Sequence, residues 1–102
     1  MRLEDLVKTI NVRSEADPSE SWTAKLLSRG PEKCAEKFGE EAIEAIIEAV
    51  KGDNKALISE AADVIFHYLI MLKSRNIKFE DVMKELKNRT NKSGLREKED
   101  RS

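Results

Sequence analysis

Two pairs of acidic residues stand in a stretch of the sequence that is otherwise strongly apolar. Glu41 and Glu44 form the first pair, Glu60 and Asp63 form the second, and Gly52 lies midway between the pairs. Residues three apart on a helix lie on the same face, so each pair can offer two carboxylates to one ligand. Buried carboxylates are costly unless they are paired, protonated or bound to a metal ion. The two pairs are therefore candidate metal ligands.

The position of Gly52 predicts that the two pairs meet. If the chain reverses there into an antiparallel helical hairpin, Glu44 and Glu60 each lie eight residues from the turn. Glu41 and Asp63 each lie eleven residues from it. At a rise of about 1.5 Å per residue, the pairs lie at matching heights, roughly 12 to 16 Å from the bend. We expect four carboxylates to face one another.

The surrounding residues favour a buried site over ordinary surface charge. From Ala56 to Leu72 the only charged residues are Glu60 and Asp63, and most of the others are apolar. A helix that is apolar on nearly all sides is a buried helix, so solvated surface charge is the weaker alternative. A set of ligands made of oxygen atoms suits Mg²⁺ or Mn²⁺, whereas zinc would require cysteine or several histidines.

Composition predicts one all-α domain. The chain is 38% charged and 39% hydrophobic, with only 4 Gly and 2 Pro, which favours helices over a sandwich or barrel. A net charge of -1 argues against a nucleic-acid binder. The N-terminus lacks the apolar core of a signal peptide, and residues 56–72 are too short and acidic to span a bilayer. With Cys34 expected as a buried free thiol, we expect a cytoplasmic protein.

Apolar spacing and capping residues predict five helices. They cover residues 3–12, a short segment after Ser19 or Ser21 that closes at Gly30, residues 31–50, a segment from Asp53 to near Asn76, and residues 79–89. Residues 1–90 would form the domain, and 91–102 a charged tail that is mobile unless a ligand or partner orders it. Two long helices that are apolar on nearly all sides are hard to cover with three short amphipathic ones. We therefore expect a helical bundle around the central hairpin, completed by homodimerisation.

The acidic pattern E-E-x-x-E followed by E-x-x-D resembles the signature of the MazG-like all-α nucleoside triphosphate pyrophosphohydrolases. Within that superfamily the chain is similar to the phosphoribosyl-ATP pyrophosphohydrolases of histidine biosynthesis. The resemblance covers most of the chain. It is carried by SWTAKLL at residues 21–27, EKFGEEAIEAIIEA at 36–49, SEAADVIFHYLIML at 59–72 and SGLREK at 93–98.

The resemblance implies cleavage of phosphoribosyl-ATP to phosphoribosyl-AMP and pyrophosphate. It implies Mg²⁺ held by Glu41, Glu44, Glu60 and Asp63. Four carboxylates exceed the charge of one Mg²⁺ by two and the triphosphate adds more negative charge, so we expect more than one ion with substrate bound. Glu40 lies about 100° around the helix from Glu41. It is either a residue that orients water near the metal or an exposed acid.

Several further residues are candidates for contact with the substrate. Lys37 could bind phosphate or offset the acids, and His67 could orient Asp63, meet the ligand or be a satisfied core histidine. Lys25 is a candidate by resemblance alone. A basic, glycine-containing flap over the phosphates would be formed by Arg89, Lys92, Ser93, Gly94 and Arg96, for which plain disorder is the alternative.

Two other functions use the same sequence features. A house-cleaning pyrophosphohydrolase acting on free nucleotides such as dUTP or dCTP would keep the acids and differ in the pocket for base and sugar. A non-catalytic helical dimer would use the acids to hold a structural cation or a basic partner. A ferritin-like di-iron protein is disfavoured, because the sequence contains no Glu-x-x-His.

Overall fold

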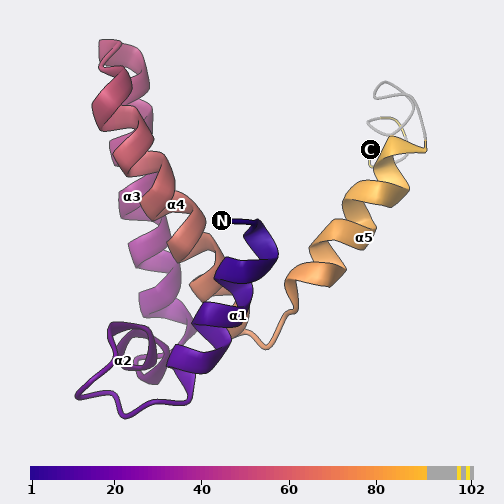
Figure 1. Cartoon of the computed structure of the whole chain (residues 1–102). Coiled ribbons are helices and arrows are strands. Elements are labelled where there is room, and N and C mark those ends of the chain that lie inside the picture. Colours follow the sequence, from indigo (N-terminus) through magenta and orange to yellow (C-terminus); the bar gives the residue numbers. More distant parts are fainter. Residues whose placement is uncertain (92–98, 100, 102) are drawn as a thin grey trace.

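Local capping interactions set the ends of the helices in the computed structural model, which describes residues 1–91, 99 and 101. The helices are α1 (Leu3–Ser14), α2 (Trp22–Ser28), α3 (Pro31–Lys51), α4 (Asn54–Ser74) and α5 (Phe79–Thr90) (Figure 1). No strand occurs in this part of the chain. The prediction of an all-α fold is confirmed.

Ser21, Gly52 and Asp53 lie at helix ends as predicted, whereas α2 ends at Ser28, before Gly30, and α4 ends at Ser74, before Asn76. The Ser21 Oγ accepts a hydrogen bond of 3.1 Å from the Ala24 N–H at the start of α2. Asp53 Oδ1 likewise accepts one of 3.0 Å from the Ala56 N–H at the start of α4. Gly52 ends α3 with a φ of 77°, a left-handed conformation that glycine adopts without steric cost.

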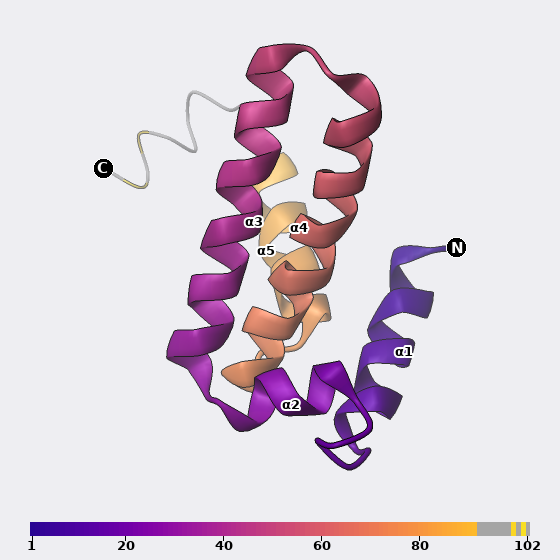
Figure 2. The same ribbon diagram turned by 90° about the vertical axis from the view of Figure 1, so that its left-hand side faces the viewer.

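α3 and α4 lie side by side and run in opposite directions (Figure 2). Their contacts are the most extensive between any two of the five helices. The rings of Phe38 and Tyr68 pack across the lower part of this hairpin, with centroids 6.2 Å apart. The hairpin therefore fixes the height of residues on α3 against residues on α4.

The buried core lies at the base of the hairpin, where α1 and α2 pack against it. Its buried apolar residues come from the first four helices: Ile10, Leu26, Cys34, Leu69 and Ile70. The Cys34 thiol is free, and its Sγ lies 3.4 Å from the Leu26 carbonyl oxygen that accepts its hydrogen bond. Burial raises the pKa of this thiol. None of the described helices combines the length and apolar character needed to cross a membrane.

The upper half of the hairpin exposes two different flanks. One, the apolar flank, consists of Ile43, Ile46, Ile47, Val50, Ile58 and Ile65, which are 45% to 83% exposed. At about 100° per residue, its α3 members lie about 140 to 240° around the helix from Glu41. The other, the acidic flank, consists of Glu41, Glu44, Glu60 and Asp63. No described helix packs over the apolar flank.

We predict that Ile70→Ala lowers the free energy of unfolding by about 2–5 kcal/mol, because the truncation leaves a cavity among fully buried neighbours. Urea denaturation at one fixed protein concentration measures this change. Val12→Ala is the matched control, since Val12 is 72% exposed and its loss should change stability by less than about 0.5 kcal/mol. Equal effects of the two substitutions would contradict this location of the core.

Candidate metal centre

Three carboxylates from the two helices of the hairpin converge on one point. One oxygen atom from each of Glu41, Glu60 and Asp63 lies within 4.8 Å of the others. Glu44 is not part of this group of three. Its carboxyl group nevertheless lies close enough to Glu41 and Glu60 to raise the pKa of both. The structure thus brings three of the four predicted ligands together and leaves the fourth beside them.

The pKa values of the acids reflect burial and mutual repulsion. Burial, the neighbouring Glu44 and the charges of Glu44 and Asp63 raise the pKa of Glu41 to about 7. For Glu60, the neighbouring Glu44 is the largest cause of the raised pKa, and burial is the second. Such shifts arise where carboxylates share a site without a cation between them.

A divalent cation fits this arrangement on two observations. First, Glu60 Oε2 is buried and has no hydrogen-bond partner among the residues described. Second, Lys37, the lysine one turn before Glu41 on α3, pairs with another acid, and its Nζ lies 3.4 Å from Glu40. Oxygen donors in a partly buried cluster suit a hard cation such as Mg²⁺ or Mn²⁺. The cluster can therefore bind a metal ion.

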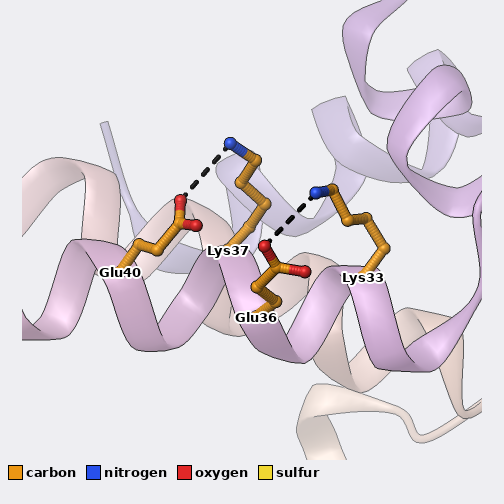
Figure 3. A network of polar contacts seen from close by, with 4 residues as sticks. All are labelled: Lys33, Glu36, Lys37 and Glu40. Atoms are coloured by element: carbon orange, nitrogen blue, oxygen red, sulfur yellow. Dashed lines mark hydrogen bonds and ion pairs between the residues drawn. The ribbon is translucent and has the colours of Figure 1, made fainter.

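Lys37 and Glu40 lie next to the cluster and pair with each other. Figure 3 shows this pair and the equivalent pair of Lys33 with Glu36, 3.3 Å apart, one turn earlier on α3. Glu40 is exposed. The predictions for Lys37 placed it with the metal ligands or the phosphates and did not include Glu40 as its partner. The spacing of three residues between a lysine and a glutamate was the signal for it.

His67 occupies a buried position one helical turn beyond Asp63. Its side chain is 7% exposed, and Nδ1 has no hydrogen-bond partner within the described part of the chain. Its ring meets the edge of Phe66 at a centroid distance of 5.2 Å. Burial lowers the pKa of His67, while the charge of Asp63 acts in the opposite direction. A neutral imidazole with a free nitrogen therefore borders the acids.

Two further predicted residues lie on helices other than α3 and α4. Lys25 is exposed in the last turn of α2. Arg89 is on α5, where its Nε donates a hydrogen bond of 3.1 Å to Glu85 Oε1. The predicted flap residues Lys92, Ser93, Gly94 and Arg96 lie outside the described residues.

We predict that the metal-free protein loses stability as pH rises from about 4.5 to about 7. The pKa of Glu41 is higher in the folded than in the unfolded chain, so folding takes up a proton in this range. The stability that this proton uptake adds is fully present below about pH 4.5 and is lost as the pH rises past about 7. Mg²⁺ should restore stability at higher pH, because it binds the ionised carboxylates.

Thermal unfolding in EDTA and in Mg²⁺ across this pH range measures both effects. Glu41→Gln is the control, and should flatten the pH dependence and weaken the response to Mg²⁺. The pKa of Asp17 is lowered by its hydrogen bonds with Ser19. Asp17 therefore affects stability at lower pH, and its contribution is lost as the pH falls. A metal-free protein that gains stability towards pH 7 through Glu41 would contradict the prediction.

Comparison with known proteins agrees with this geometry. The family model described as phosphoribosyl-ATP pyrophosphohydrolase matches residues 3–90. A phosphoribosyl-ATP pyrophosphatase of Ruegeria pomeroyi is 62% identical over 96 residues, which cover 94% of this chain and 91% of that protein. Those of Jannaschia sp. and Roseobacter denitrificans are 61% and 60% identical, over 97% and 99% of this chain and 97% and 96% of their own lengths. The chain belongs to the phosphoribosyl-ATP pyrophosphohydrolase family.

Proposed function

We propose that this protein hydrolyses phosphoribosyl-ATP to phosphoribosyl-AMP and pyrophosphate, the second step of histidine biosynthesis. The family match over residues 3–90 supports the reaction. The observation that carries it in the structure is the cluster of Glu41, Glu60 and Asp63, whose carboxylate oxygens converge without a compensating lysine among the described residues. A polyphosphate cannot approach such a cluster unless cations lie between them.

The four acids would hold Mg²⁺, with Glu41 and Glu44 contributed by α3 and Glu60 and Asp63 by α4. Bound Mg²⁺ supplies positive charge that neutralises the phosphate oxygens and the leaving pyrophosphate. More than one ion per site is needed, because the four carboxylates and the triphosphate together carry far more charge than one ion offsets. The protein itself contributes mainly positioning and fixed charge.

Lys37 and His67 would contact the substrate beside the metal. Both lie fifteen residues from Gly52, so they face each other one helical turn below Glu41 and Asp63. The exposed pair of Lys37 with Glu40 is weak, so a phosphate can take Lys37 from it. Glu40 is then free to orient water. The orphaned Nδ1 of His67 supports a hydrogen bond to the ligand.

Lys25 and Arg89 are also proposed substrate contacts, together with Ser93 and Gly94 of the C-terminal tail. We place the enzyme in the cytoplasm, where its free Cys34 would stay reduced. We further propose a homodimer. The exposed isoleucines of the apolar flank support it, because monomers rarely leave so many large apolar side chains together on one surface.

We predict that Glu60→Gln or Asp63→Asn lowers kcat/KM for phosphoribosyl-ATP at least about 100-fold, because each removes a charged ligand from the metal. Pyrophosphate release in saturating Mg²⁺ measures the rate. Glu36→Gln is the control, since Glu36 lies on the same helix but pairs with Lys33, and it should leave the rate nearly unchanged.

The same variants distinguish catalysis from a structural role for the acids. Without metal, Glu60→Gln should be at least as stable as the parent, because the substitution relieves repulsion between carboxylates. Near-normal turnover in either neutralised variant would contradict the assignment of that residue as a metal ligand. A preference for dUTP or dCTP over phosphoribosyl-ATP in a substrate panel would overturn the proposed substrate.

A further inference from the structure

We infer that Lys33 binds the far end of the substrate, the monophosphate on the ribose that is attached to the adenine ring. The inference deepens the proposed function and rests on it for the identity of the substrate. Phosphoribosyl-ATP differs from ATP by this additional ribose phosphate, so a residue that binds it would select the substrate. The inference follows from where Lys33 lies relative to Glu41 and from the weakness of its own ion pair.

Lys33, Lys37 and Glu41 form a row along α3, each about one turn after the last. At about 100° and 1.5 Å per residue, Lys37 lies about 40° around the helix from Glu41 and about 6 Å along it. Lys33 lies about 80° around the helix in the same direction and about 12 Å along it. The side chains of both lysines extend to the same side of the helix (Figure 3). The row therefore leads from the metal centre towards the base of the hairpin.

Charge along this side of α3 sets the direction in which the substrate extends. Towards Gly52 the same side carries Glu44 and Glu48, which repel a phosphate. Towards the base it carries Lys37 and then Lys33. A triphosphate held by metal ions at the acidic flank would meet Lys37 first. The rest of the substrate, an adenine with a ribose on each side, would then extend along the helix and bring its second phosphate to Lys33.

The stability of α3 does not explain a lysine at position 33. Lys33 is the third residue of α3, and the helix dipole disfavours a cation near the N-terminus of a helix. Its ion pair with Glu36 is 3.3 Å long, and the Glu36 side chain is 54% exposed. Such a pair is weak, and a lysine that precedes its glutamate is the less favourable order. A phosphate can therefore take Lys33 from Glu36.

The side chains of the two lysines in the row lie close to the protein surface. Those of Lys33 and Lys37 are 30% and 29% exposed. Lys51, which pairs with Glu48 at the other end of α3, is 64% exposed. A side chain that is already partly ordered loses less conformational entropy when it binds a ligand. Lys33 and Lys37 are thus better prepared than Lys51 to bind phosphate groups.

Steady-state kinetics of Lys33→Ala test the inference. The KM for phosphoribosyl-ATP should rise about 10- to 100-fold with little change in kcat, because the lost contact is made equally in the substrate and the transition state. Lys33→Arg should restore most of the affinity, since a guanidinium also binds phosphate. In thermal unfolding, Lys33→Ala should be at least as stable as the parent. An unchanged KM combined with lower stability would show that Lys33 only supports the helix, and would overturn the inference.

A binding measurement that needs no turnover separates this inference from the proposed function. In Mg²⁺, isothermal titration calorimetry should show that the parent binds phosphoribosyl-AMP about 10- to 100-fold more tightly than AMP, which lacks the second phosphate. Lys33→Ala should remove most of this preference, and the matched control Lys51→Ala should keep it. A preference that survives Lys33→Ala, or an equal loss of affinity for both nucleotides, overturns the inference even if hydrolysis of phosphoribosyl-ATP is confirmed. Absence of that hydrolysis in the parent would instead overturn the proposed function.

Discussion

Repulsion among carboxylates held between two apolar helices is the constraint on which this structure depends. Glu41 and Glu60 have raised pKa values because each is buried to some degree and faces other acids. Isolated, such a cluster favours neutralisation by protons; with divalent cations it becomes a strong site. The acidic cluster therefore attracts positive charge. Cations shared between these carboxylates and the phosphates of a substrate would bring the two anionic partners together.

The stabilising core and the acidic cluster occupy different parts of the hairpin. Ile10, Leu26 and Ile70 are buried at its base, where α1 and α2 close over α3 and α4. The cluster lies farther up, towards Gly52, where Ile43, Ile46 and Ile58 are 59% to 72% exposed. Because of this separation, the base of the hairpin stabilises the fold, while the upper hairpin carries the carboxylates that lower its stability. A site that destabilises the metal-free protein is tolerable because the core does not depend on it.

Local interactions explain which features could be predicted from sequence. Ser21, Gly52 and Asp53 set helix ends through contacts within a few residues, and equal spacing from Gly52 brings the carboxylates to one height. Features that depend on tertiary neighbours were harder to predict. A satisfied core histidine is one alternative for His67, yet its Nδ1 has no hydrogen-bond partner among the described residues. The pairing of Lys37 with Glu40 competes with longer-range attraction to the acids, and only the folded geometry decides between them.

The division of the hairpin into an acidic and an apolar face links assembly to chemistry. A flat pair of helices cannot cover both of its own faces, and among the described helices α5 makes no extensive contact with the others. The pairing through the apolar face that we propose would remove water from the isoleucines and leave the acidic face open to cations and phosphates. Burial of the isoleucines would then provide free energy that offsets the repulsion among the carboxylates. In such a dimer the apolar face would stabilise the hairpin, while the acidic face would remain available to metal ions.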